Sequence, residues 1–368
     1  MTTATIEEIA LSMIPGLGCA GLRRLIKIAG SAHEVYNMPP TEVYALFGNR
    51  RNIAGSIVNK STFARAEAET ASCQKRGIRA LFFTNPAYPQ RLNRSECEDC
   101  PPLIYIIGEC NLNAERIISI VGTRRATNYG RSQTERIVEE LKDEGVTIVS
   151  GLAYGIDATS HSAAVERNMP TVAVLGHGLD QIYPVENTRL AHTMVERGGA
   201  LLTEYTVGTA LNARYFPARN RIIAALSDAV VVVEASDKGG ALITANIANS
   251  YNRDVLAVPG RATDTYSKGC NALIANNKAI MARNADDILY ALNWQRQSLP
   301  HTTQTELFNT LSPEEGAVVN LLKECDEATA DLLAAKSGLS FARLSAMLID
   351  LELKNILKCL PGKRYTLV

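Results

Sequence analysis

Short runs of β-branched and other apolar residues recur along the middle of the chain, separated by amphipathic stretches of helical length. Segments such as 133–144 and 158–167 place their apolar residues at helical spacing. Near-continuous apolar strands that alternate with helices predict an α/β fold, a parallel sheet covered by helices on both faces. The five runs that predict buried strands are 117–121, 146–149, 171–175, 229–233 and 254–258.

The stretch 215–235 combines a helix, a turn and a buried strand with a basic, aromatic beginning. Three arginines and two aromatic rings precede the apolar part of the helix, with no acidic residue among them. Such a set suits a phosphate chain that carries bases. A purely structural use, with the rings in the core and the arginines on a solvated face, is equally open from this stretch alone. The residues concerned are Arg214, Tyr215, Phe216, Arg219, Asn220 and Arg221.

Residues 1–76 predict a helical domain of short helices. The glycines of 14–18 predict a tight turn between two helices, a helix-hairpin-helix (SAM-like) arrangement that points backbone N–H groups at nucleic-acid phosphates. Residues 47–51 resemble a degenerate second copy. Nine Lys and Arg against six Asp and Glu in this segment support weak DNA contact and plain packing about equally.

The C-terminal part predicts a winged helix. Residues 295–311 are polar and patternless, which is typical of a linker. Ser312 and Glu315 have the spacing of a capping box, and three helices and a hairpin follow within 312–368. The expected recognition helix has Arg343 as its single basic residue. Residues 312–368 contain seven basic and eight acidic residues. A duplex-reading domain is more basic than this, so protein contact or an accessory role is the better expectation.

Length and composition set the remaining bounds. A chain of 368 residues predicts several domains, which we place at 1–76, 77–294 and 312–368. Lys plus Arg and Asp plus Glu both number 38, so an anion site must be a local patch. We expect no signal peptide, no membrane span and no metal, and the scattered cysteines fit reduced thiols in a cytoplasmic protein.

The ends of the predicted strands carry the candidate chemistry, because ligands of such sheets bind outside the carboxyl ends of the strands. Glycines there leave N–H groups open to an anion, arginines add charge, and tyrosines offer ring faces, which together suit single-stranded nucleic acid. The glycines are Gly122, Gly151, Gly155, Gly176 and Gly178; the arginines are Arg124, Arg125 and Arg131; the tyrosines are Tyr129, Tyr154, Tyr183 and Tyr215.

Competing motifs are incomplete. Residues 176–181 lack the third glycine of a dinucleotide fingerprint, and the chain has no P-loop, so no cofactor is expected. Asp157 and His161 fit structural roles, whereas His177 is a possible ligand contact. One enzymatic alternative stays open, a phosphoribohydrolase-like site in which Gly239, Gly240 and Thr244 hold a phosphate beside Glu234.

Six segments taken together resemble the DprA/Smf family of bacterial DNA-processing proteins. They occur in the family's order and span most of residues 80–290, and the helical and winged-helix flanks also match its extended layout. Residues 185–186 (VE) depart from the family, since many relatives have a basic residue there. The segments are 119–124 (SIVGTR), 150–157 (SGLAYGID), 178–184 (GLDQIYP), 216–222 (FPARNRI), 239–244 (GGALIT) and 258–260 (VPG).

The resemblance implies a Rossmann-like domain that binds single-stranded DNA and is not an enzyme. It also implies protection of incoming DNA during natural transformation, loading of the RecA recombinase, and a homodimer formed through the Rossmann-like domain. By the same resemblance, Gly122 and Arg124 contact phosphates. Residues 219–221 (RNR) form a further DNA-binding element, and Arg214 and Phe216 line the same pocket. The full set of expected DNA-binding residues is Gly122, Thr123, Arg124, Arg125, Gly151, Gly155, Gly176, Gly178, Arg214, Phe216, Arg219, Asn220 and Arg221.

Overall fold

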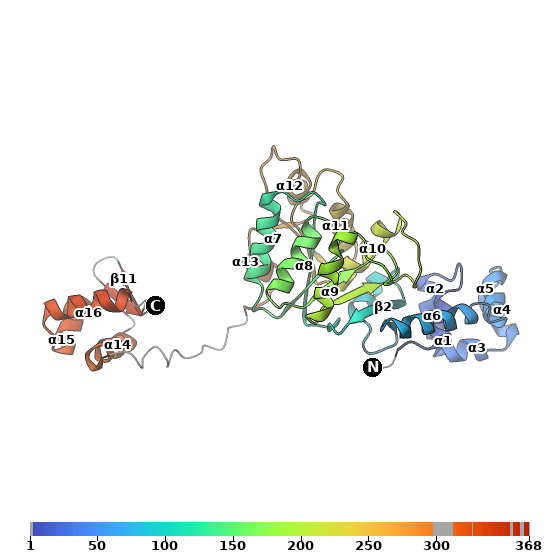
Figure 1. Ribbon diagram of the computed structural model, residues 1–368, viewed down its shortest axis with the longest axis horizontal. Helices are drawn as coiled ribbons and strands as arrows, with labels where there is room; N and C mark the ends of the chain where they lie inside the picture. The colour runs from blue at the N-terminus through green and yellow to red at the C-terminus, as the bar shows by residue number, and fades with distance from the viewer. Residues whose placement is uncertain (1–2, 297–311, 326, 354–355, 361–363, 368) are drawn as a thin grey trace. The chain divides into compact units, whose positions relative to one another are not determined.

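A computed structural model describes residues 3–296, 312–325, 327–353, 356–360 and 364–367. The chain divides into two compact units, Met1–Gln297 and Ser298–Val368 (Figure 1). Most of the expected linker, residues 297–311, lies outside the described residues.

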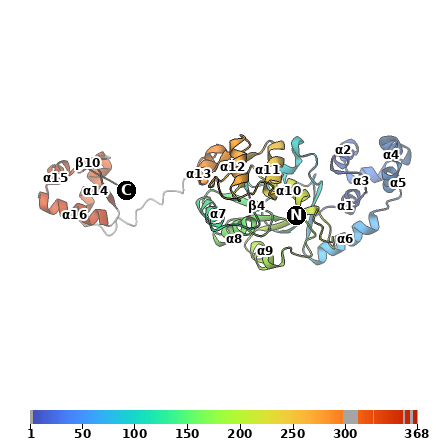
Figure 2. The same cartoon turned by 90° about the horizontal axis from the view of Figure 1, so that it is seen from above.

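A nine-stranded sheet forms the centre of the first unit (Figures 1 and 2). The strand order is β1-β2-β6-β5-β4-β3-β7-β8-β9, and every neighbouring pair from β6 to β9 is parallel. This confirms the α/β prediction, with two antiparallel strands, β1 and β2, added at one edge. The strands are β1 (Arg79–Phe82), β2 (Leu103–Gly108), β3 (Arg116–Val121), β4 (Val146–Ser150), β5 (Thr171–Val174), β6 (Ala200–Thr203), β7 (Ala229–Val232), β8 (Asp254–Ala257) and β9 (Ile280–Met281).

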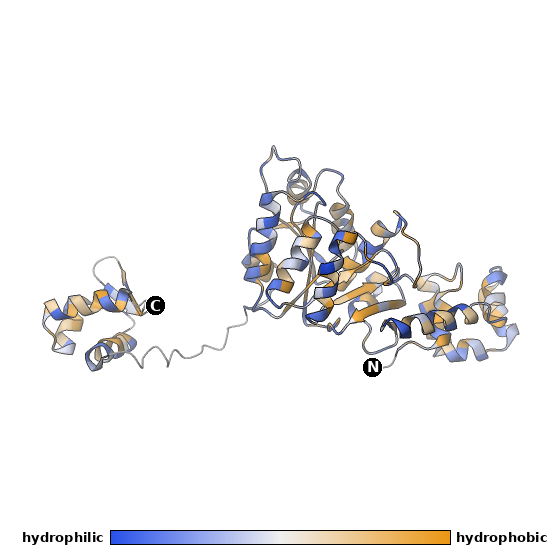
Figure 3. Cartoon of the chain, in the orientation of Figure 1, coloured by the Kyte–Doolittle hydropathy of each residue, from blue (hydrophilic) through white to orange (hydrophobic). Residues whose placement is uncertain are grey.

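The side chains of successive strand residues pack into two different hydrophobic cores, because side chains alternate between the faces of a sheet. On β3, Ile117 joins the cluster under one group of helices, whereas Ile118 joins the cluster under the other. Figure 3 shows apolar strands between helices that have one hydrophobic side. The first group is α10 (Tyr215–Leu226), α11 (Gly240–Ser250) and α12 (Lys268–Ala275); the second is α7 (Asn128–Glu140), α8 (Ile156–Glu166) and α13 (Ala285–Ala291).

The N-terminal helices pack directly on the sheet. Leu103 and Tyr105 of β2 share a buried cluster with them and with α9 (Thr188–Glu196). Residues 1–76 therefore have no core separate from that of the sheet, and the boundary expected at residue 76 stays a prediction. The helices are α1 (Ile6–Ser12), α2 (Cys19–Ala29), α3 (Ala32–Asn37), α4 (Pro40–Phe47), α5 (Arg51–Val58) and α6 (Phe63–Lys75).

The order of the strands creates a switch point beside β3. From β3 the chain adds β4, β5 and β6 in one direction, then returns through α10 to place β7 on the other side of β3. Loops that follow β3 and β7 consequently diverge at the carboxyl edge of the sheet. Such a divergence leaves a crevice in which sheets of this kind bind ligands.

In its described residues, the second unit has three helices and a three-stranded sheet of order β10-β12-β11. Ser312 and Glu315 form the predicted capping box, with Ser312 N to Glu315 Oε2 at 2.7 Å. None of the described helices is long and apolar enough to cross a membrane alone; only α15 with α16, bent by 114°, passes by length and composition. The elements are α14 (Pro313–Cys325), β10 (Glu327–Thr329), α15 (Ala330–Ser337), α16 (Phe341–Leu353), β11 (Leu357–Leu360) and β12 (Arg364–Leu367).

Candidate nucleic-acid interface

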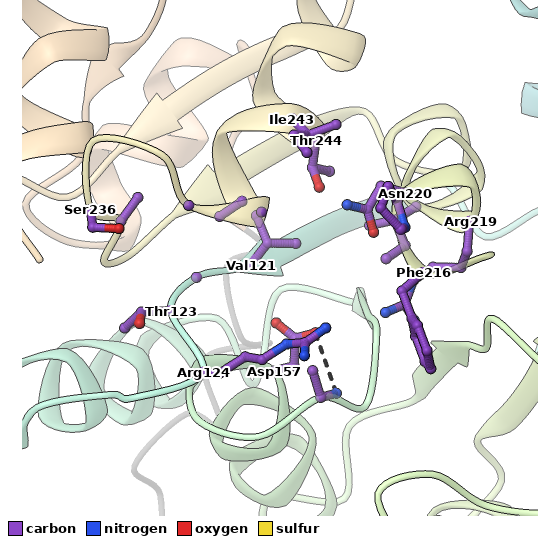
Figure 4. Close-up of a pocket in the computed structure, with 18 of the residues that line it drawn as sticks. Val121, Thr123, Arg124, Asp157, Phe216, Arg219, Asn220, Ser236, Ile243 and Thr244 are labelled. Atoms are coloured by element: carbon purple, nitrogen blue, oxygen red, sulfur yellow. Dashed lines mark hydrogen bonds between the residues drawn. The ribbon is translucent and has the colours of Figure 1, made fainter. Parts of the chain in front are cut away.

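A pocket of about 440 Å³ lies in the crevice at the carboxyl edge of the sheet. The loops after β3, β4 and β7 and the first turns of α10 and α11 form its walls (Figure 4). The lining residues that carry the argument below are Gly122, Thr123, Arg124, Asp157, Phe216, Arg219, Asn220, Ser236, Gly239, Gly240, Ile243 and Thr244.

Arg124 and Phe216 face each other across this pocket. The Arg124 side chain is exposed and extends from the loop after β3 towards the ring, with Cζ 5.9 Å from the ring centroid (Figure 4). Phe216 also packs against Tyr183, with ring centroids 5.5 Å apart. A cation beside two aromatic faces can hold a phosphate and stack a base at the same place.

Two helices present their N-termini to the pocket without a side-chain cap. Neither Arg214 before α10 nor Gly239 before α11 accepts a capping hydrogen bond from its helix. By contrast, Thr127 caps α7 by accepting from Gly130 N at 3.2 Å. In the first turn of α10 only Phe216 N remains available, because Tyr215 N donates to the Asn212 carbonyl oxygen at 3.0 Å and Pro217 has no N–H. The N–H groups of Gly240 and Ala241 remain available at α11, and helix N-termini favour anions.

Arg219 lines the pocket but uses its guanidinium inside the protein. Only 4% of the residue is exposed, and Nη1 donates to the carbonyl oxygens of Gly151, at 2.7 Å, and Val174. Burial lowers the pKa of Arg219 to about 10, and burial also raises the pKa of nearby Asp157. The geometry gives Arg219 the role of tying α10 to the ends of β4 and β5.

The residues beside Arg219 that were also expected to bind DNA occupy different positions relative to the pocket. Asn220 lines the pocket and is half-buried, whereas Arg221 is not among the lining residues. Arg221 Nη2 instead pairs with Glu204 Oε2 at 2.6 Å, and both side chains are largely buried. Arg214 is exposed just before α10 but does not line the pocket. The pocket therefore brings together Arg124, Phe216 and Asn220, whereas Arg214 and Arg221 lie outside its lining.

Most of the predicted glycines are required for close packing. A Cβ on Gly122 would lie 2.5 Å from Ile156 Cγ1, and one on Gly151 would lie 2.6 Å from Arg219 Nη1. Gly155 has φ +77° and backs onto the Thr123 carbonyl, and Gly176 contacts Phe216. A Cβ on Gly178 would meet Asp180 Oδ1 and the Thr206 carbonyl oxygen, each at 2.5 Å. Only Gly122 of these five lines the pocket, and contact of their N–H groups with DNA stays a prediction.

A wider groove of about 960 Å³ adjoins the pocket at Arg124 and runs between α7, α8 and α9. Arg125, Arg131 and Arg189 line it, together with Gly155. Tyr154 and Glu186 face the same groove, and the tyrosine hydroxyl donates to Glu186 Oε2 at 2.5 Å. Thr123 lies at the junction, where its Oγ1 accepts from Arg125 N at 3.1 Å.

The carboxylate of the enzymatic alternative is turned away from the pocket. Glu234 is buried and accepts from Thr127 N at 3.0 Å and from Thr127 Oγ1 at 2.5 Å. His161 is also buried; its Nδ1 lies 2.7 Å from Thr171 Oγ1, and burial lowers its pKa to about 3. His177 is buried beside the Gly178 carbonyl, so it offers no exposed contact.

Asp157, Ser236 and Ile243 are among the lining residues that were not predicted as part of the site. The rule that ligands bind at the carboxyl ends of strands would have found Ser236, which follows β7. No sequence signal marks Ile243, which is 44% exposed on α11 although it is apolar. Within the described residues, no group of three His, Cys, Asp or Glu is arranged to hold a metal ion.

Comparison with known proteins places this architecture in a family. Residues 79–293 match the family described as DNA recombination-mediator protein A, and residues 303–363 match the DprA winged helix domain. Protein Smf of Synechocystis is 33% identical over 97% of both chains, and protein Smf of Escherichia coli is 35% identical over 82% of this chain and 81% of its own.

Two solved structures share the fold. DprA from Streptococcus pneumoniae has a TM-score of 0.67 at 30% identity, covering 78% of this chain and 98% of its own. DNA processing protein A from Helicobacter pylori, whose structure concerns its single-stranded DNA binding mode, has a TM-score of 0.53 at 28% identity, covering 59% and 97%. The chain belongs to the DNA recombination-mediator protein A family, which includes the DprA and Smf proteins.

Proposed function

We propose that the carboxyl-edge pocket binds single-stranded DNA without sequence preference. The observation that carries the proposal is the exposed Arg124 guanidinium held 5.9 Å from the Phe216 ring, in a pocket that the first turns of α10 and α11 also line. A phosphate between Arg124 and the N-termini would leave its base beside the rings of Phe216 and Tyr183. Paired bases are already stacked inside a duplex, so these rings favour an unpaired strand.

The groove beside the pocket supports an extended path for the strand. Arg124 belongs to both cavities, and Arg125, Arg131 and Arg189 continue the line of cations beyond it. Among the described residues that line the pocket, Asp157 is the single acidic one, and it accepts a hydrogen bond from Ala153 N at 3.4 Å. The groove also has Glu135, Glu166 and Glu186 in its lining. The arginines that line the two cavities still outnumber the carboxylates, which favours a polyanion although the chain as a whole is neutral.

The test is a gel shift with matched single and double strands over a range of salt. We expect preference for the single strand and a logarithmic salt slope of roughly −0.7 per phosphate neutralised. Arg124→Ala should weaken binding to all sequences alike and flatten the slope. Lys278→Ala removes an exposed cation just before β9, at the opposite edge of the sheet, and is the matched control. Equal affinity for both forms of DNA, or equal loss in the two variants, would contradict the proposal.

The family resemblance supports a finer role, in which the bound strand is protected and handed to the RecA recombinase in the cytoplasm during DNA uptake. It also supports a homodimer through the Rossmann-like domain. RecA filament formation on a strand coated with single-strand-binding protein, with and without this protein, tests the loading step. Light scattering tests the dimer, and a monomeric mass at micromolar concentration would count against it.

The position of the Glu234 carboxylate favours binding without catalysis. A phosphoribohydrolase would need Glu234 free beside Gly239 and Gly240, but its carboxylate is bonded to Thr127. Incubation with AMP followed by chromatography tests this directly. Release of adenine would revive the enzymatic alternative.

A further inference from the structure

A second pocket, of about 330 Å³, lies where the N-terminal helices meet the sheet. Gly18 and Cys19 at the start of α2 form one wall, and Tyr105 of β2 contributes to another. Residues 204–206, together with Thr209 and Tyr215, complete it. Figure 1 places α2 and α6 beyond the β2 side of the sheet. The DNA-binding pocket proposed above does not include any of these residues.

Two tyrosine rings make an aromatic wall in this pocket. Tyr205 and Tyr215 stack with centroids 4.3 Å apart and an interplanar angle of 28°. Both residues are half-buried, so part of the stacked pair remains open. A ring pair of this kind offers a planar surface on which a further flat group can stack.

Two buried polar groups at the pocket lack partners among the described residues. The Tyr105 hydroxyl has none, although the residue is only 2% exposed. Glu204 bonds Arg221 through Oε2, but its Oε1 has no partner. Buried polar groups are ordinarily hydrogen-bonded, so an unpartnered hydroxyl and an unpartnered carboxylate oxygen at one cavity indicate a missing polar ligand.

The mouth of the pocket favours an anion. Gly18 precedes α2 with φ +68° and gives it no side-chain cap, so the first N–H groups of this 11-residue helix are free of a capping partner. Arg65 of α6 also lines the pocket and is exposed. A ligand that is planar at one end, bears an amino group, and is anionic at the other matches a nucleotide.

We propose that this second pocket binds one unpaired nucleotide of a DNA strand, with a preference for bases that carry an exocyclic amino group. The base stacks on the Tyr205–Tyr215 pair, its amino group donates to Glu204 Oε1, and the Tyr105 hydroxyl donates to a base carbonyl. The phosphate lies at Arg65 and the start of α2. Cytosine has such an amino group and thymine does not, so the pocket discriminates between the two pyrimidines.

The inference rests on the proposed function, because the strand must reach both pockets. Tyr215 lines the second pocket and Phe216, the next residue, lines the first. Likewise, Thr209 lines the second pocket and Ala213 lines the first, and both belong to one short loop before α10. A strand that crosses the first turn of α10 at the exposed Arg214 therefore passes from one pocket to the other.

The experiment measures fluorescence anisotropy of the full chain with oligo-dC and oligo-dT of equal length. We expect the wild type to bind oligo-dC about three- to tenfold more tightly. Glu204→Gln should remove that preference. Tyr105→Phe should weaken binding to both oligonucleotides about three- to tenfold without lowering the melting temperature, because it deletes only a hydroxyl that has no partner in the described structure.

The outcomes separate this inference from the proposed function. If Arg124→Ala weakens binding while Tyr105→Phe equals the wild type and dC equals dT, the second pocket is overturned and the first remains. If the wild type binds neither oligonucleotide, the proposed function fails, and saturation-transfer NMR with free dCMP then tests the second pocket alone. A signal that Tyr105→Phe abolishes supports that pocket, and the absence of a signal from the wild type overturns it.

Discussion

The Arg219 guanidinium occupies the space that the missing side chain of Gly151 leaves. Its Nη1 donates to the Gly151 carbonyl oxygen at 2.7 Å and would lie only 2.6 Å from a Cβ on that glycine. The helix that carries the basic element is thereby fixed to the end of β4. Arg219 thereby holds Phe216 and Asn220, its neighbours on α10, at the pocket, and its own contact with DNA stays a prediction.

Gly151→Ala should lower the free energy of unfolding by about 2 kcal/mol or more, because the added methyl group overlaps a buried guanidinium and the surrounding packing cannot yield freely. Urea unfolding measures the effect. Gly240→Ala is the control, since no atom lies within 4 Å of its added Cβ and the site begins a helix. Similar midpoints for both variants would show that the Arg219 contact is not rigid.

Arg221→Met should destabilise the protein by about 3–5 kcal/mol, because it strands the buried Glu204 carboxylate without its partner. The double variant Arg221→Met/Glu204→Met should recover most of that loss, which urea unfolding of both proteins checks.

A comparison of DNA binding then assigns the role of Arg221. Folded Arg221→Met/Glu204→Met should retain the salt slope of the wild type on oligo-dT, since the guanidinium does not line the first pocket and thymine offers Glu204 no amino group. A slope reduced as much as that of Arg124→Ala would instead make Arg221 a phosphate contact.

His161 should make the fold sensitive to acid. Its folded pKa is lowered to about 3 by burial, below the unfolded value near 6.5, so between these values the unfolded chain binds a proton that the folded chain does not. Stability is full above pH 6.5 and falls as the pH drops towards 3, by up to about 1.4 kcal/mol per unit. The difference between the urea midpoints at pH 7 and pH 5 should be smaller in His161→Gln than in the wild type. His192→Gln, which changes an exposed histidine, controls for composition.

Glu186→Gln should raise the affinity for single-stranded DNA about twofold, because it removes a negative charge from the groove lined by Arg124 and Arg125. The gain should shrink at high salt, as screening weakens the repulsion. Anisotropy titrations at two salt concentrations measure both effects. Glu196→Gln alters an exposed carboxylate outside that groove, and an equal gain there would mean that only net charge matters.

The strands that the sequence predicted are those whose apolar runs are continuous. Residues 229–233 became β7, and the helix before it became α10. The strand β6 was missed, because its apolar run, residues 200–202, has only three residues and follows two glycines. The direction of the two antiparallel edge strands, β1 and β2, depends on pairing between distant segments. Local pattern does not encode such pairing.

Local sequence determined which segments form strands and helices in this protein, and that arginines and aromatic residues gather where those strands end. It did so because periodicity and turn residues act over a few neighbours. Only the tertiary structure decided which guanidinium is exposed at the pocket. The sequence marks Arg124, Arg219 and Arg221 equally as cations. In the structure Arg124 is exposed beside Phe216, Arg219 is hydrogen-bonded to carbonyl oxygens, and Arg221 is paired with Glu204. Those partners come from distant parts of the chain, and burial beside them fixes what each charge can do.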